Sequence, residues 1–335
     1  MVTVGLVAFC FLATPGWTRG NQTPCFMTPQ AWQSRFVKPN SVQLSAIIFY
    51  GRRHHVRVLD KYLKQNLVSA GGLLQEVLWF VHTEDAEDIH WLNQTLLPSE
   101  PHYYKAATSG NFASFYRELE DNRYYIKFDD DIMYIRRGTI EAMLHEKLQK
   151  RYWMVSANVI NHPVLSHVHA SLGALQTYKQ QGREFVVGNS SFLEGSPFMS
   201  MDSNPHGNCA LGSMECAAIS HYNFLANIDK EGGLDKYDFG TWDFNAFDGY
   251  PRWSINTFIF KGSDLNKEEI LADDEKSIAV LLPEIKKVHS GAVGKAIVVH
   301  LSYKPQRVDG LEQQTNVAAH YVALARKLTG PLLDV

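Results

Sequence analysis

Residues 124–135 read YYIKFDDDIMYI, so three consecutive aspartates stand between two apolar runs. The run YYIKF predicts a buried β-strand, and IMYI predicts that the chain continues in an extended conformation after the acids. A surface turn at this position would more often contain Gly, Asn or Pro. The sequence therefore places Asp129, Asp130 and Asp131 at the carboxyl end of a buried strand, the edge where open α/β sheets bind ligands.

The acidic run is a candidate metal site. Three adjacent carboxylates repel one another, and burying them without compensation is unfavourable. A divalent cation removes this penalty, and carboxylate oxygens suit magnesium, manganese or calcium. With few protein ligands, the ion keeps positions open for water and substrate phosphates. The alternative is a solvated turn or a helix cap, where acidic residues are also common.

The chain on either side alternates strand patterns with helix patterns, which predicts crossover connections. Short apolar runs predict strands at residues 42–50, 77–81, 153–157, 254–260 and 296–299. Apolar residues at helical spacing predict helices at 56–67, 85–97, 111–119, 138–148 and 273–281. We therefore expect an α/β fold with a mostly parallel central sheet flanked by helices. Residues 163–248 lack this periodicity, and we expect them to form a long irregular region that shapes the substrate site.

The composition restricts the class of protein. A chain of 335 residues with 45% hydrophobic residues can bury a large core. Its formal net charge is -3, with 32 basic and 35 acidic residues mixed along the sequence. Because no long basic tract is available to neutralise a phosphate backbone, nucleic acid is not an expected partner. No Ser-, Gly- or Pro-rich linker divides the chain, so we expect one elaborated domain over residues 42–330.

The first 27 residues contain an apolar segment, 2–13, followed by Pro15 and Arg19. This pattern resembles a signal peptide or a short membrane anchor, although the basic start is missing, and a buried N-terminal element is the alternative. We expect the secretory pathway, in the lumen of the endoplasmic reticulum or Golgi, with membrane association through the N-terminus; the cytoplasm is the alternative. In an oxidising compartment Cys209 and Cys216 could close a short loop.

At the acidic run the chain resembles the metal-dependent glycosyltransferases of the GT-A fold, whose signature is Asp-x-Asp after a hydrophobic strand. Asp129 and Asp131 match the two outer aspartates. The sequence IKFDDDIMYI followed by VSANVINHP is similar to that of a group of fungal proteins described as glycosyltransferases, and the resemblance covers residues 44–307. It implies a GT-A-like, Rossmann-related catalytic domain, with a nucleotide-sugar half at about 42–160 and an acceptor half at about 161–310.

The resemblance also implies a metal site. In GT-A enzymes the last aspartate of the motif binds the metal and the first contacts the donor ribose or the metal, so these roles pass to Asp131 and Asp129. Many members add a late histidine as a further ligand, and His300 in AIVVHLSYKPQR fits that pattern at the end of a predicted strand. A lone histidine is more often a packed or surface residue. The implied cofactor is Mn²⁺ or Mg²⁺.

A carboxylate near the start of a late helix serves as the base in inverting members of the family. Asp273, Asp274 and Glu275 match that placement, and the family pattern favours Asp274. Acids in the first turn of a helix are also favoured by capping and by the helix dipole, so a structural role stays open.

The family binds its nucleotide at the ends of the first two strands and at the acidic run. The implied donor-binding residues are Tyr50, Gly51, Arg52, Glu84, Asp85, Lys127 and Asp130. Side chains suited to sugar stacking and hydroxyl recognition suggest acceptor binding by His162, Trp242 and Asp243, although tryptophan is more often a core residue.

These expectations describe a hexosyltransferase-type enzyme. It would move a sugar from a nucleoside-diphosphate donor, a uridine diphosphate sugar being the commonest in the family, to a hydroxyl of a glycan, protein or small molecule. The metal would stabilise the leaving diphosphate. Two other classes stay open: a metal-dependent phosphoesterase or nucleotidyltransferase, which should need acidic ligands from several strands, and a non-catalytic nucleotide- or glycan-binding protein.

Overall fold

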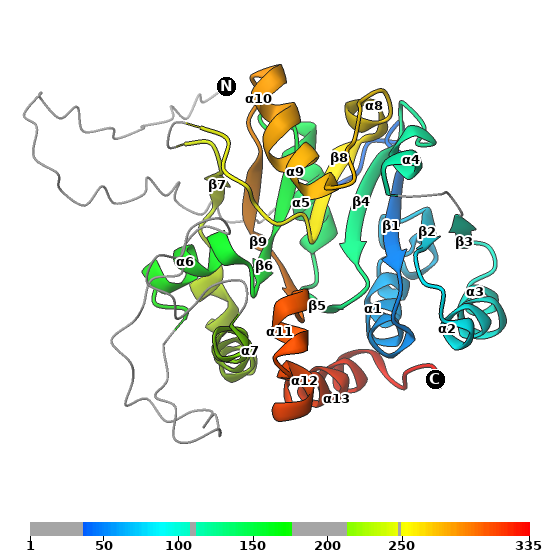
Figure 1. Cartoon of the computed structure of the whole chain (residues 1–335), viewed down its shortest axis with the longest axis vertical. Coiled ribbons are helices and arrows are strands. Elements are labelled where there is room, and N and C mark those ends of the chain that lie inside the picture. The colour runs from blue at the N-terminus through cyan, green and yellow to red at the C-terminus, as the bar shows by residue number, and fades with distance from the viewer. Residues whose placement is uncertain (1–35, 108–111, 176–212, 247–248) are drawn as a thin grey trace, which may run out of the picture.

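The computed structural model describes residues 36–107, 112–175, 213–246 and 249–335. Within these ranges a central β-sheet of nine strands forms the core of the molecule (Figure 1). The strand order is β3-β2-β1-β4-β8-β6-β9-β5, and β7 pairs with β9 beside this path. The strands are β1 (Leu44–Tyr50), β2 (Glu76–Val81), β3 (Tyr104–Ala107), β4 (Tyr124–Asp129), β5 (Ile132–Ile135), β6 (Val155–Ile160), β7 (Thr241–Asp243), β8 (Thr257–Lys261) and β9 (Gly291–His300).

Helices flank this sheet, so the expected α/β fold is confirmed (Figure 1). The longer helices are α1 (Arg53–Gln65), α5 (Thr139–Leu148), α6 (Pro163–Ser171), α7 (Met214–Ile228) and α13 (Val317–Thr329). The shorter ones are α2 (Ala86–Trp91), α3 (Leu97–Ser99), α4 (Phe112–Arg117), α8 (Gly262–Leu265), α9 (Asp274–Lys276), α10 (Leu282–Lys286), α11 (Lys304–Val308) and α12 (Leu311–Gln314). Of these, α1 packs against β5 and α13, and α5 packs against β6, β8 and β9.

The sheet is mixed rather than mostly parallel. Its first part is parallel, because β1 lies parallel to β2 and β4, and β2 lies parallel to β3. Beyond β4, however, β8 runs antiparallel to both of its neighbours, and β5 and β7 run antiparallel to β9. The sequence of β8, TFIFK, is almost entirely buried, so it has the continuous apolar pattern of a parallel strand. Strand direction could not be inferred from that pattern.

Two predicted helices each contain a π-helical turn. The helix predicted at 85–97 corresponds to α2 and a π-helix at Leu92–Leu96 and continues into α3. The helix predicted at 273–281 corresponds to α9 and a π-helix at Ser277–Leu281 and continues into α10. Pro98 and Pro283 follow the two π-helices. Proline has no N–H and its ring clashes with the carbonyl of the preceding turn, so a widened turn before it lets the chain remain helical.

The region 163–248 was expected to be irregular, but its described part contains α6 and α7. Most residues of α7 are buried, so this helix lacks the polar face by which an amphipathic helix is recognised in a sequence. Residues 1–27 and Cys209 lie outside the described residues, so the N-terminal targeting segment and the Cys209–Cys216 pairing stay predictions. Among the helices that the structure describes, none has the length and apolar character needed to span a membrane.

Candidate metal centre and substrate cavity

The acidic run lies where three strands meet. β4 ends at Asp129, and β5 begins at Ile132, which pairs with His300 at the end of β9. Between the two strands, the carbonyl of Asp131 accepts a hydrogen bond of 3.0 Å from the N–H of Leu301. The antiparallel pairing of β5 with β9 therefore brings a histidine from late in the chain beside the aspartates.

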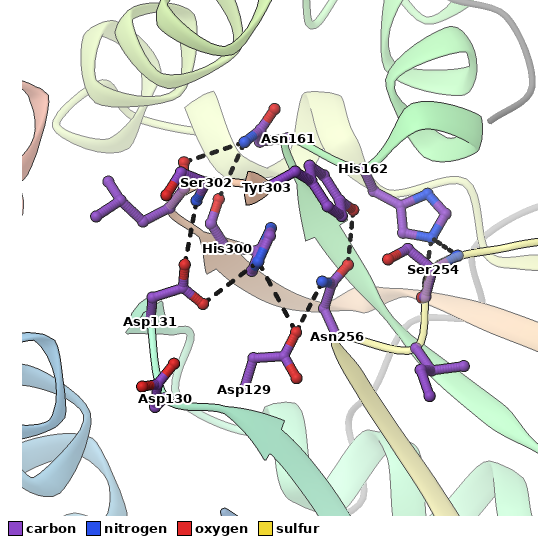
Figure 2. A network of polar contacts seen from close by, with 12 residues as sticks. Asp129, Asp130, Asp131, Asn161, His162, Ser254, Asn256, His300, Ser302 and Tyr303 are labelled. Atoms are coloured by element: carbon purple, nitrogen blue, oxygen red, sulfur yellow. Dashed lines mark hydrogen bonds and ion pairs between the residues drawn. The ribbon is translucent and has the colours of Figure 1, made fainter. Parts of the chain in front are cut away.

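Asp129, Asp131 and His300 form one group of potential metal ligands (Figure 2). One ligand atom from each side chain lies within 4.8 Å of the others. The Nε2 atom of His300 is 3.3 Å from Oδ1 of Asp131 and 3.8 Å from Oδ2 of Asp129. Oδ1 of Asp131 is buried and accepts no hydrogen bond from the described residues. An orphaned carboxylate oxygen beside an imidazole nitrogen suits a divalent cation such as Mn²⁺ or Mg²⁺, and this group could hold one.

The charges around Asp131 favour its ionised form. Burial would raise the pKa of this carboxyl, but His300 and Arg52 outweigh burial and hold the pKa well below its usual range. Nη2 of Arg52 lies 3.4 Å from Oδ2 of Asp131, and Nη1 of Arg307 lies 3.8 Å from the same oxygen. The buried carboxylate is therefore available as an anionic ligand.

Asp130 binds the guanidinium group of Arg52 and is not a member of the metal group. Nε of Arg52 donates to Oδ2 of Asp130 at 3.1 Å, and Nη2 donates to Oδ1. Burial raises the pKa of Asp130 in spite of this pairing. A side chain at Gly51 would place its Cβ atom 3.2 Å from Oδ2 of Asp130, so the glycine leaves room for the carboxylate. The middle aspartate thereby orients Arg52 beside the metal group.

Lys127 lies two residues before Asp129 and therefore on the same face of β4. Its ammonium group donates to Oδ1 of Asp129 and, at 2.9 Å, to the carbonyl of Ile255. Burial would lower the pKa of Lys127, but the carboxylates of Asp129 and Asp274 raise it above its usual value. The lysine is thus a buried cation that neutralises part of the acidic charge.

A cavity of about 460 Å³ opens beside the metal group. Pockets for small ligands occupy roughly 300–1,000 Å³. Most of the residues predicted as the site line this cavity: Tyr50, Gly51, Arg52, Lys127, Asp129, Asp130, Asp274, Glu275 and His300. The structure therefore brings metal ligands, cations and candidate bases from different parts of the chain to one cavity.

Two of the three candidate bases are held by Arg252. Asp273 caps α9, forms an ion pair of 3.0 Å with Arg252 and lies outside the cavity lining. Glu275 lines the cavity, but Oε1 accepts from Arg252 at 2.7 Å and Oε2 accepts from the hydroxyl of Ser254 at 3.0 Å. Both oxygens of Glu275 are therefore engaged in structural contacts.

Asp274 has fewer partners. It lines the cavity, and its Oδ2 atom lies 3.4 Å from the hydroxyl of Tyr116. Burial is the largest influence on the Asp274 carboxyl and raises its pKa, although Lys127 opposes the shift. Of the three acids, Asp274 has the surroundings that best suit a base, as the sequence analysis preferred.

At the end of β2 the cavity is lined by His82, whereas Glu84 and Asp85 lie outside the lining. Oδ1 of Asp85 accepts from the backbone N–H groups of Glu87 and Asp88 at 2.9 and 3.0 Å, so this side chain caps α2. These backbone hydrogen bonds lower the pKa of Asp85. Capping accounts for Asp85 without a nucleotide, and a role in donor binding stays a prediction.

His162, predicted to bind the acceptor, is a buried cap of α6 and does not line the cavity. Its Nδ1 atom accepts from the N–H groups of Val164 and Leu165, both at 3.2 Å. Its Nε2 atom lies 3.2 Å from the carbonyl of Ser254. Burial lowers the pKa of His162 to about 3, so the ring is neutral and joins α6 to the segment before β8.

Trp242 and Asp243, the other residues predicted to bind the acceptor, lie far from the cavity. They belong to β7, which pairs with residues 291–293 at the start of β9, whereas His300 ends that strand. The partner strand β6 advances five residues between Gly291 and Val299, which corresponds to about 17 Å along the sheet. Asp243 instead accepts from His289 at 2.9 Å.

The remaining lining residues, which were not predicted from the sequence, come from the ends of β1 and β2, from the segment before β8 and from the segment after β9. These are Phe49, His82, Ser254, Ile255, Asn256, Ser302, Tyr303, Lys304 and Arg307. Those from 302 to 307 could have been suspected because they follow His300 at a strand end. Asn256 carried no such signal, because its position depends on the pairing of β8 with β4.

Comparisons with known proteins place few restrictions on the function. No protein-family model matches the chain, and no curated protein matches it. Among solved structures, that of 4-diphosphocytidyl-2C-methyl-D-erythritol synthase from Anaerococcus prevotii DSM 20548 is similar, with 10% sequence identity and a TM-score of 0.34 over 80% of this chain and 92% of that chain. A likeness at this level leaves the function to be judged from the site itself.

Proposed function

We propose that this protein is a metal-dependent glycosyltransferase that uses a nucleoside-diphosphate sugar as donor. The supporting observation is the meeting, at one cavity, of the metal group with the guanidinium groups of Arg52 and Arg307 and the half-buried carboxylate of Asp274. An inverting transfer needs each of these: a site for the diphosphate, compensation for its charge, and a base for the acceptor hydroxyl.

The cations suit a diphosphate. Arg52 and Arg307 lie 3.4 and 3.8 Å from the same oxygen of Asp131, so phosphates beside the metal group would be within reach of both. Arginine forks bind phosphate oxygens in a bidentate manner, which adds orientation to charge compensation. A bound Mn²⁺ or Mg²⁺ would act as a Lewis acid toward the departing diphosphate.

Asp274 suits the acceptor side of the reaction. In an inverting transfer, the acceptor oxygen bonds to the anomeric carbon while the bond from that carbon to the phosphate oxygen breaks, and the hydroxyl proton passes to Asp274. Because burial raises the pKa of this carboxyl, its ionised form is a stronger base than an exposed aspartate.

The metal group also helps to distinguish a glycosyltransferase from a two-metal phosphoesterase or nucleotidyltransferase. Phosphoesterases and nucleotidyltransferases that use two metals need enough ligands to hold two ions about 3.5–4 Å apart. The described residues contain one group of potential ligands, Asp129, Asp131 and His300. A single ion that serves a leaving diphosphate fits this group better than a two-metal hydrolytic centre.

The first experiment is calorimetric titration of the full-length protein with uridine and guanosine diphosphates, each with Mn²⁺ and with chelator. We expect metal-dependent binding of the uridine nucleotide and at least about a tenfold loss in Asp131→Ala, since a principal charged ligand is removed. Asp229→Asn, which alters an exposed aspartate paired with Lys327, is the matched control. Failure of the unaltered protein to bind either nucleotide in a metal-dependent way would reject the proposal.

Slow donor cleavage in the absence of an acceptor would then define the bond that breaks. Incubation with a panel of uridine and guanosine diphosphate sugars should release a free sugar and the nucleoside diphosphate. Release of a sugar phosphate and the nucleoside monophosphate would instead assign the protein to the phosphoesterase or nucleotidyltransferase class.

A further inference from the structure

Asn256, immediately before β8, forms two hydrogen bonds with Asp129, and Figure 2 shows the one from its side chain. Its backbone carbonyl accepts from the N–H of Asp129 at 2.9 Å. Its side-chain Nδ2 atom donates to Oδ2 of Asp129, also at 2.9 Å. Oδ2 is the oxygen that lies 3.8 Å from His300, so Asn256 fixes the carboxylate in the orientation that faces the histidine.

Tyr303 connects this asparagine to the other two members of the metal group. Its hydroxyl donates to Oδ1 of Asn256 at 2.8 Å. Its ring packs edge-on against the ring of His300, with centroids 4.5 Å apart. The preceding residue, Ser302, donates its N–H to Oδ2 of Asp131 at 3.3 Å. One short segment after β9 therefore contacts His300, Asp131 and, through Asn256, Asp129.

The hydrogen bonds of Asn256 can run in one direction only. An ionised carboxylate accepts and cannot donate, so the amide must present its NH₂ group to Asp129 and its oxygen to Tyr303. The hydroxyl of Tyr303 then fixes the amide, and the amide fixes the carboxylate. A substitution that removes this hydroxyl frees the amide to rotate without removing any atom of the metal group.

The backbone just before Asn256 is also held in place by hydrogen bonds. Before Asn256, the N–H and carbonyl of Ser254 both face Nε2 of His162, and the hydroxyl of Ser254 donates to Glu275. Glu275 also lies 3.4 Å from the N–H of Ile255. Residues 254–256 are thus tied to α6 and α9 before they reach the metal group.

We propose that Asn256 and Tyr303 act as a positioning bridge that sets Asp129 toward His300 and thereby controls the affinity of the site for its divalent cation. The bridge rests on the metal site of the proposed function. Groups that orient metal ligands by hydrogen bonds commonly change metal affinity by 10–100-fold when they are removed.

The test is a direct titration with Mn²⁺ in the absence of nucleotide, in which electron paramagnetic resonance measures the concentration of free ion. Tyr303→Phe and Asn256→Ala should each raise the Kd for Mn²⁺ about tenfold or more. Because the two residues act through one chain of hydrogen bonds, the double variant should bind Mn²⁺ only slightly more weakly than Asn256→Ala. The Kd is measured without nucleotide because both side chains also line the cavity, where a nucleotide could contact them directly.

Tyr222→Phe is the matched control, because it removes a similar hydrogen bond, 2.6 Å from Tyr222 to Asn316, away from the cavity. An unchanged Kd in Tyr303→Phe, or fully additive losses in the double variant, would overturn the bridge. If Asn256→Ala fails to fold, Tyr303→Phe decides alone, since it removes one hydroxyl. Absence of Mn²⁺ binding by the unaltered protein would overturn the proposed metal site together with the bridge, whereas binding with unchanged variants overturns the bridge only.

Discussion

Asp274 is half-buried and has few partners for a carboxylate that faces the cavity. The substitution Asp274→Asn preserves the shape of the side chain, but the resulting amide cannot act as a base. We expect turnover of the donor substrate to fall about 10²–10⁴-fold, the usual contribution of a general base. Binding of Mn²⁺ and of uridine diphosphate should be unchanged, because the proposed ligands for both lie elsewhere in the cavity. Steady-state rates and calorimetry on the same preparation measure the two effects.

The control for Asp274→Asn is Asp235→Asn, which alters an exposed aspartate paired with Arg136 at 3.1 Å. This variant should keep full turnover. Full turnover in Asp274→Asn as well would show that another group accepts the proton.

Asp129 and Asp131 could be predicted from the sequence because they follow an apolar strand, whereas His300 was predicted through the resemblance to the GT-A enzymes. Asp129, Asp131 and His300 stand at strand ends, and strand ends of one sheet meet at a common edge. Asn256 and Tyr303 could not be found in this way, because a polar residue beside an apolar run is common. Their role depends on which strands become neighbours, and that is decided by packing of the whole sheet.

At the scale of elements, β9 contains an irregularity that carries a close backbone contact. Its register with β6 shifts between Ala157 and Asn158, opposite residues 293–297. Within the shift, a Cβ atom on Gly294 would lie 2.4 Å from the backbone nitrogen of Phe239. The carbonyl of Gly294 also accepts from Asn158 at 2.7 Å. The bulge thus joins β9 to the chain before β7 at a point where only glycine fits.

Gly294→Ala should therefore destabilise the protein. The added methyl group must displace backbone atoms, and overpacking of this kind costs about 1–3 kcal/mol. We expect the urea midpoint to fall with an unchanged denaturant slope, measured by circular dichroism. A midpoint equal to that of the unaltered protein would mean that the loop before β7 yields without cost.

The elements that were predicted from the sequence are those with a strong apolar pattern, such as β1, β4 and α1. Those that it missed have weak patterns for physical reasons. α7 is buried on most sides and β7 has three residues, so neither shows a clear period. The direction of β8 was also beyond the sequence, because a strand buried on both faces has the same composition whichever way it runs.

At the scale of the whole molecule, three neutral histidines are built into the interior. Besides His162, these are His169, whose Nε2 atom lies 2.6 Å from Oδ1 of Asn158, and His221, whose Nε2 atom lies 2.8 Å from the carbonyl of Leu301. Burial lowers their pKa values to about 3 for His162 and His169 and to about 4 for His221. They join β6, α6, α7 and the segment after β9, so their protonation bears on the stability of the entire fold.

The sign of the resulting pH dependence follows from these shifts. A histidine in the unfolded chain titrates near 6.5, whereas in the folded chain His169 titrates near 3. Below 6.5 the unfolded state therefore takes up a proton that the folded state does not, and the free energy of unfolding falls as pH falls toward 3. The loss is about 1.4 kcal/mol per pH unit for each such histidine.

Replacement of His169 measures the contribution of this histidine to the loss of stability at low pH. His169→Gln keeps a donor toward Asn158 but cannot titrate, so between pH 6 and pH 4 its stability should fall less steeply than that of the unaltered protein, by about 1.4 kcal/mol per pH unit. Urea denaturation at several pH values measures the two slopes. His54→Gln, at an exposed position on α1, should leave the slope unchanged. Parallel curves for the unaltered protein and His169→Gln would mean that His169 is protonated in the folded state. The interior near β6 would then accommodate a charge or water in spite of the hydrogen bond to Asn158.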